Sequence, residues 1–200
     1  MLLLFLLITY TSGTSYSLLK NYELLSITSA STSTYGPLSS FSFSGTLSEF
    51  SIFFFIKVTT WSGSSSNFVK IGNFALATSS SQVKLTVSSS ITISVSSSKV
   101  INNWCLFLAS QGSSGMALYV ITEDSDYIYT TSTSPTPSSK YVKTTDSVVI
   151  GGASTRGYIH SFYIQNSHIS SQYPIYVLFN YLHSISFLKG SYYAIKVFIK

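Results

Sequence analysis

The acidic side chains are the first residues of this 200-residue chain that could do chemistry, because two suitably spaced carboxyl groups cleave glycosidic bonds. The chain has six of them, and only Glu123, Asp124 and Asp126 lie close together. Retaining hydrolysis needs carboxyl groups about 5–5.5 Å apart, and inverting hydrolysis about 6.5–9.5 Å, on either side of a bound sugar. These three acids instead occupy a short polar segment between apolar runs, where a turn is expected. The sequence therefore predicts that the protein is not a glycoside hydrolase.

Histidine, serine and cysteine form no recognisable catalytic or metal-binding pattern. His160, His168 and His183 stand in or beside expected strands, with no Cys or Glu at ligand spacing, so hydrogen-bonded structural histidines are favoured. Serine is abundant, but no Gly-x-Ser-x-Gly occurs. The single Cys105 follows Trp104 in a strongly apolar segment, so we expect a buried and inert thiol.

Aromatic and basic side chains in loops remain as candidates for ligand contact. Sugars stack on Trp and Tyr rings and bond to Asn, Ser and Thr, and most of the 15 tyrosines should serve the sandwich itself. Trp61 begins a serine-rich loop, residues 61–67, and is the best single candidate for an exposed platform. Arg156, the only arginine, lies on a glycine-rich turn and is the second candidate.

Composition favours an all-β fold and argues against nucleic acid as a partner. Charged residues make up 8% of the chain and aromatic residues 16%, and Ser, Thr, Tyr, Phe, Ile and Val dominate, as is typical of strands. The net charge of +5 comes from cations that are scattered singly, without the cluster that phosphate binding requires.

The alternation of apolar and polar residues predicts about a dozen short strands and no substantial helix. Residues 49–58 and 104–110 are apolar on both faces, so both strands should be covered on both sides. Hairpins are expected for residues 68–78 around Gly72-Asn73 and for residues 83–95, which carry one wet face. This pattern predicts a two-sheet antiparallel β-sandwich of jelly-roll type.

Residues 147–171 form the most distinctive stretch. A β-branched run ends at Gly151-Gly152, a turn with Arg156 follows, and alternation resumes at Tyr158. Simple alternation places Tyr158, His160, Phe162 and Ile164 on one face of this strand. The apolar residues that we expect to contact the core are Ile159, Phe162 and Ile164. A dinucleotide-binding loop is excluded, because a strand and not a helix follows the glycines.

The first residues predict secretion. Residues 1–10 are an apolar run too short to span a bilayer, and small residues follow that suit a cut before Thr14 or before Leu18. We therefore expect residues 1–17 to be a signal peptide and the protein to be secreted, extracellular or at the cell surface. A buried N-terminal strand is the alternative, since no Lys or Arg stands near Met1. Residues 175–188 are too polar for a membrane span, and a piece of a longer protein stays open as an alternative to a whole one.

The order of these features resembles the laminin G-like jelly-roll domains of the concanavalin A-like lectin/glucanase superfamily. Residues 117–121 are similar to the family's "LYV-turn" hairpin, and residues 149–152 with 157–166 resemble its "IGG … GxIxxVxIYN" signature. The resemblance covers residues 22–171 and implies one sandwich domain over residues 18–200. The hairpin tip at residues 122–126 lacks the family's glycine, and His160-Ser161 replaces an acidic pair that many relatives have.

The resemblance implies a non-catalytic extracellular recognition module that binds glycan or extracellular protein. Many relatives bind calcium at the sandwich rim, and Glu123, Asp124 and Asp126 could supply two or three of the six to eight oxygens that calcium prefers. A solvated acidic turn is the alternative for these residues. Two other functions stay open: a structural or adhesive segment of a larger surface protein, and a degenerate carbohydrate-active enzyme.

Overall fold

The structure, a computed structural model, describes residues 15–17, 25–27, 32–41, 43–60, 66–78, 82–87, 91–96, 100–122, 127–132, 137, 139, 141–151 and 156–169. Strands dominate these residues, and η1 (Leu38–Phe41) is a short 3-10 helix. None of the helical segments in the described ranges is long and apolar enough to cross a membrane.

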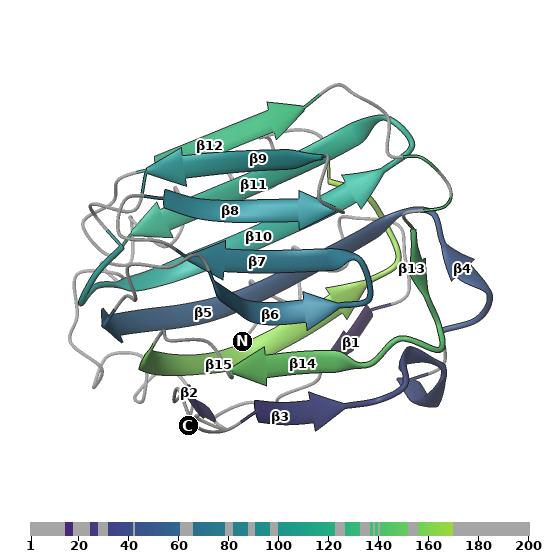
Figure 1. Ribbon diagram of the computed structural model, residues 1–200, viewed down its shortest axis with the longest axis horizontal. Helices are drawn as coiled ribbons and strands as arrows, with labels where there is room; N and C mark the ends of the chain where they lie inside the picture. The colour runs from purple at the N-terminus through teal and green to yellow at the C-terminus, as the bar shows by residue number, and fades with distance from the viewer. Residues whose placement is uncertain are drawn as a thin grey trace.

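Two antiparallel sheets pack face to face, which confirms the predicted β-sandwich (Figure 1). The seven-stranded sheet contains β1 (Ser15–Ser17), β2 (Leu25–Ile27), β5 (Phe50–Thr60), β10 (Trp104–Gly112), β11 (Gly115–Thr122), β12 (Tyr127–Ser132) and β15 (Arg156–Gln165). The six-stranded sheet lies in front of it in Figure 1 and has the order β3 (Thr32–Tyr35), β14 (Val148–Gly151), β6 (Ser66–Ile71), β7 (Phe74–Thr78), β8 (Gln82–Val87) and β9 (Thr92–Ser96). A small two-stranded sheet joins β4 (Thr46–Leu47) to β13 (Val142–Lys143).

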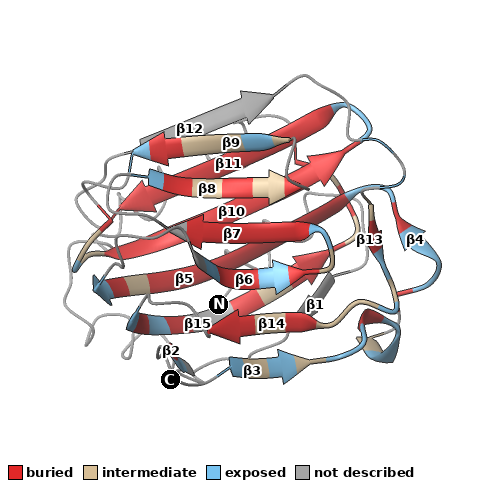
Figure 2. Ribbon diagram, viewed as in Figure 1, coloured by how far each residue is buried: buried red, intermediate tan, exposed pale blue. Residues whose placement is uncertain are grey.

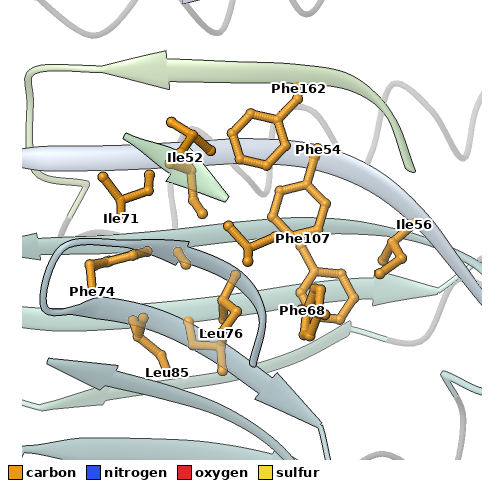
Figure 3. Packing of buried hydrophobic residues seen from close by; sticks show 14 of the residues in the cluster. Ile52, Phe54, Ile56, Phe68, Ile71, Phe74, Leu76, Leu85, Phe107 and Phe162 are labelled. Carbon is orange, nitrogen blue, oxygen red and sulfur yellow. The ribbon is translucent and has the colours of Figure 1, made fainter. Parts of the chain in front are cut away.

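Four phenylalanines hold the two sheets together at the centre of the sandwich (Figure 3). Phe54 stacks on Phe107 with ring centroids 5.5 Å apart and on Phe162 at 5.1 Å, so three adjacent strands of one sheet contribute to one stack. Phe68, from β6 of the other sheet, meets Phe54 and Phe107 edge-on, each at 6.2 Å. Such stacked and edge-to-face pairs are the arrangements that ring quadrupoles favour.

β5, β10 and β11 are buried along most of their length (Figure 2), so their outward side chains are buried as well as their inward ones. Phe53 and Leu108 are each 1% exposed, yet neither belongs to the cluster of buried residues between the sheets. Ser51 and Ser110 share this outer face, and their hydroxyl groups bind the backbone of Ser167 and Ile169. The strands predicted to be apolar on both faces are therefore covered on both sides.

The stretch predicted as strand, glycine turn and strand links the two sheets. β14 belongs to the six-stranded sheet, and β15 belongs to the seven-stranded sheet. A register irregularity between His160 and Tyr163 interrupts the alternation of β15. Ile159, Phe162 and Ile164 consequently all reach the core, as predicted, whereas Tyr158 lies on the opposite face. The simple alternation that grouped Tyr158 with Phe162 is wrong because it assumed a regular strand.

Candidate functional site

β5 and β11 finish, and β15 begins, at the same end of the seven-stranded sheet. β5 ends at Thr60, which pairs with Arg156 at the start of β15. Cys105 of β10 pairs both with Ile56 of β5 and with Thr122, the last residue of β11. We call this the Thr60 end of the sandwich; the start of β5 lies at the other end.

Of the residues predicted from sequence to bind a ligand or a metal, the structure describes Arg156, which lies at this end. Arg156 is exposed there. Trp61 follows Thr60 in the chain but lies outside the described residues, so its role stays a prediction. The same holds for the acids that follow Thr122, which are Glu123, Asp124 and Asp126.

Tyr158 is the large apolar side chain that the described part of the chain leaves exposed, at 39%. Its neighbours across the sheet are Lys57 of β5, which is half-buried, and Ser26 of β2, which is exposed. Residues directly opposite in an antiparallel pair have Cβ atoms about 4.5–5.5 Å apart and share a face. An aromatic ring therefore stands between a cation and a hydroxyl group on the outer face of the sheet.

A β-bulge shapes this corner of the sheet. Arg156 pairs with Thr60 and Gly157 pairs with Val58, which leaves Thr59 without a partner residue in the ladder. The Thr59 hydroxyl donates to the carbonyl oxygen of Arg156 at 3.2 Å. Gly157 is needed here, because an added Cβ would overlap the Lys57 carbonyl oxygen. We call the exposed group that results the Tyr158 corner; it comprises Ser26, Lys57, Thr59, Arg156 and Tyr158.

Asn102 adds an amide to the same end of the molecule. Its backbone N–H donates to the carbonyl oxygen of Val58 at 2.7 Å, and its neighbour Ile101 forms an isolated bridge with the same residue. Asn102 is exposed and has a positive φ of 64°, a conformation that Asn adopts more readily than most residues. The aromatic, cationic and hydroxyl groups of the Tyr158 corner thus lie on one side of β5 and the Asn102 amide on the other, at the same end of the sandwich, where a polar ligand could stack and form hydrogen bonds.

A second polar cluster, at the opposite end, contains a serine and a histidine in contact. Ser110 Oγ lies 2.6 Å from His168 Nδ1 and 3.0 Å from Ser51 Oγ, and it accepts from Ile169 N at 2.9 Å. Ser110 is 0% exposed, so no substrate can reach its oxygen. His168 packs over Gly112, where an added Cβ would come within 2.7 Å of the ring. His168 is therefore the hydrogen-bonded structural histidine that the sequence predicts, and the cluster fixes the chain that follows β15.

The surroundings of His168 favour its neutral form. Burial lowers the pKa of His168 below its ordinary value of 6.5, and the negative charge of Glu49 opposes that shift. Of the other histidines, His160 pairs with Phe55 in the ladder, and His183 lies outside the described residues.

No metal centre is present among the residues that the structure places. Within those ranges, no three His, Cys, Asp or Glu side chains come together as metal ligands would. The predicted calcium ligands lie outside them, so calcium binding stays a prediction. Cys105 is buried between the sheets, as predicted, with its thiol 3.7 Å from the carbonyl oxygen of Asn103.

Sequence reasoning missed Tyr158 and Lys57 as site residues. Tyr158 is one of 15 tyrosines, and simple alternation puts it on the same face as Phe162, so the sequence alone predicts a residue of the sandwich core. Lys57 was the usable signal, because a lysine on an otherwise apolar face marks the point where that face meets water. Its partner Tyr158 lies a hundred residues further on and is identified only by the register.

Comparison with known proteins defines a class of fold and no family. Neither a family model nor a curated protein matches the chain. Among solved structures, the receptor binding domain of botulinum neurotoxin mosaic serotype C/D matches with a TM-score of 0.55 and 10% identity, covering 84% of this chain and 45% of that one. The ligand binding domain of botulinum neurotoxin serotype D, in complex with N-acetylneuraminic acid, matches with a TM-score of 0.54 and 11% identity over 84% and 46% of the two chains.

Part of an enzyme also shares the fold. Trypanosoma rangeli sialidase, in complex with sialic acid, matches with a TM-score of 0.50 and 12% identity, covering 66% of this chain and 22% of the sialidase. The chain spans less than half the length of each of these three proteins. At such low identity the likeness shows the fold alone, which is an all-β sandwich found in receptor-binding domains and in a sialidase.

Proposed function

We propose that the chain is a laminin G-like recognition module that acts outside the cell or at its surface and binds a glycan without cleaving it. The observation that carries this proposal is Tyr158, exposed on the outer face of the seven-stranded sheet between Lys57 and Ser26. The ring offers a stacking surface, and the surrounding hydroxyl and amide groups offer hydrogen bonds of the kind that orient a sugar. A binding surface on an extracellular protein is the second ligand class that such a corner suits.

The two cations of the corner favour an acidic sugar. Arg156 presents a planar fork that matches a carboxylate, and Lys57 adds a second positive charge beside the ring. Two of the solved structures with this fold were determined with sialic acid, which carries a carboxylate. These structures support an acidic sugar as the first ligand class to examine.

Two further parts of the proposal rest on sequence. Glu123, Asp124 and Asp126 follow the last residue of β11 at the same end and would hold a calcium ion that assists binding. Residues 1–17 would direct secretion; a cut before Thr14 would keep β1, whereas a cut before Leu18 would remove it.

A glycan array with sialylated and neutral glycans, read with and without a chelator, tests the proposal. We expect binding to sialylated members and about tenfold weaker binding, or ~1.4 kcal/mol, for Tyr158→Ala and for Arg156→Gln. Lys143→Gln is the matched control, because it removes an exposed charge in β13, near the opposite end (Figure 1). Silence of the wild-type chain on a broad array would reject the glycan proposal.

The remaining functions give different results in companion measurements. A permanent partner recovered by cross-linking in the source would indicate a structural or adhesive segment. Turnover of a sialoside or β-glucan that Asp124→Asn abolishes would establish a carbohydrate-active enzyme. Loss of array binding in chelator, restored by added calcium, would support the calcium site.

A further inference from the structure

The outer face of the six-stranded sheet is basic and rich in hydroxyl groups. Val83, Leu85 and Val87 of β8 point into the core, so Lys84 and Thr86 between them point outward. None of the six strands of this sheet contains Asp or Glu. Figure 2 looks onto this face and shows its exposed and half-buried positions.

The register places two lysines on either side of β7. Lys70 of β6 pairs with Ala75, and Ala77 pairs with Lys84 of β8. Neighbouring strands lie about 4.8 Å apart and residues rise about 3.4 Å along a strand, so the two lysine Cα atoms are separated by about 12 Å. Lys70 is exposed and Lys84 is half-buried.

The surface between the lysines is flat. Ala75 and Ala77 are the outward residues of β7, and each is only 7% exposed. Beyond them, Ala75 pairs with Thr86 of β8, whose hydroxyl group lies 3.3 Å from that of Thr92 on β9. A surface of alanine methyl groups, flanked by cations and hydroxyl groups, suits an extended ligand that lies along the sheet.

Neither lysine has an ion-pair partner in the described ranges. Asp146 is the carboxylate closest along the chain to these strands, but its Oδ2 accepts from the backbone N–H of Lys143 at 2.8 Å. Glu49 directly precedes β5, a strand of the seven-stranded sheet. The exposed Lys70 and the half-buried Lys84, without a carboxylate partner among the described residues, give the face charge complementarity to an anion.

We propose that this face binds a linear acidic polysaccharide. Its carboxylate or sulfate groups would pair with Lys70 and Lys84, and its hydroxyl groups would bond to Thr86 and Thr92. An exposed ion pair contributes about 0–1 kcal/mol, so a repeating polymer, which rebinds along its length, fits better than a single sugar. A single-stranded nucleic acid fits less well, because none of the described residues that point outward on this face carries an aromatic ring on which a base could stack.

This proposal goes beyond the proposed function and is independent of it. Tyr158 lies on the outer face of the seven-stranded sheet, and Lys70 lies on the outer face of the six-stranded sheet. Either surface could bind its ligand if the other did not, and separate variants distinguish the two.

The test measures binding of the full chain to immobilised polygalacturonate and dextran sulfate, with neutral dextran as reference. We expect retention on at least one acidic polymer that falls as salt rises, because exposed charges are screened. Lys70→Gln/Lys84→Gln should reduce that binding at least fivefold, and the stronger of the two polymers identifies the anionic group. Thermal unfolding of each variant verifies that it folds.

The control has the same loss of charge at another place. Lys140→Gln/Lys143→Gln removes two cations from the chain just before and within β13, outside both proposed surfaces, and should leave polymer binding within twofold of wild type. An equal loss in both double variants would overturn the proposal, since net charge alone would then explain binding. Equal binding to neutral dextran, or tighter binding to single-stranded nucleic acid than to either polymer, would also overturn it.

Discussion

At the residue scale, His168 is held by a buried serine beside the chain that follows β15. The single hydroxyl hydrogen of Ser51 goes to the carbonyl oxygen of Ser167, and Ser110 Oγ accepts from Ile169 N. Ser110 Oγ and His168 Nδ1 share a hydrogen bond in which either atom can be the donor. Burial favours the neutral imidazole, because it lowers the pKa of His168.

A dependence of stability on pH follows. Because the pKa of His168 is lower in the folded chain than the ordinary 6.5, the unfolded chain binds more protons between the two values. The contribution of His168 to the free energy of unfolding is therefore fully present above pH 6.5. It decreases as pH falls from 6.5 through the pKa of the folded chain. Urea unfolding between pH 7.5 and 5 should show this decrease in wild type and a smaller one in His168→Asn, which cannot titrate. Parallel curves for the two proteins would contradict the assignment.

At the scale of the element, the bulge in β5 depends on a glycine. In Gly157→Ala the new methyl group would overlap the Lys57 carbonyl oxygen, and backbone atoms in a ladder cannot move aside as a side chain does. We expect the free energy of unfolding to fall by about 3 kcal/mol, at the upper end for overpacking. Circular dichroism during urea titration measures this.

The control for that substitution separates steric overlap from backbone strain. At Gly45 an added Cβ meets no atom within 4 Å, but φ is 72°, so Gly45→Ala reports strain alone, about 1–2 kcal/mol. Equal losses for the two substitutions would show that close approach to Lys57 does not matter.

Local signals in the sequence determine most elements but not which sheet they join. Gly72-Asn73 predicts the β6–β7 hairpin, and the structure has Gly72 at a φ of 54°, as a tight turn between strands requires. The strands β14 and β15 are also predicted, yet nothing local places them in different sheets. Their partners, β6 and β5, lie about 80 and about 100 residues earlier in the chain, respectively. Non-local pairing and bulges therefore limit what alternation alone predicts.

At the scale of the whole molecule, the candidate site depends on distant segments. Ser26, Lys57 and Tyr158 come from three strands that only the folded sheet brings together. The sequence predicted the all-β sandwich and one exposed member of the corner, Arg156, because loop composition is a local property. It could not predict Tyr158, since the bulge that separates its face from that of Phe162 arises from pairing with β5.

The two proposed surfaces lie on opposite sides of one sandwich, so they should act independently. Packed sheets are about 10 Å apart, and sites separated by more than about 7–10 Å without shared partners contribute additively. We expect saturating N-acetylneuraminic acid to leave polygalacturonate binding within twofold of its value without the sugar. Tyr158→Ala combined with Lys70→Gln/Lys84→Gln should show each loss of affinity unchanged by the other, measured by calorimetry with the two ligands in turn. Competition between sugar and polymer would mean that both bind one surface, because thermodynamic linkage makes any coupling reciprocal. Additive losses would instead assign the acidic sugar to the corner built by β2, β5 and β15, and the polymer to the face built by β6, β7 and β8.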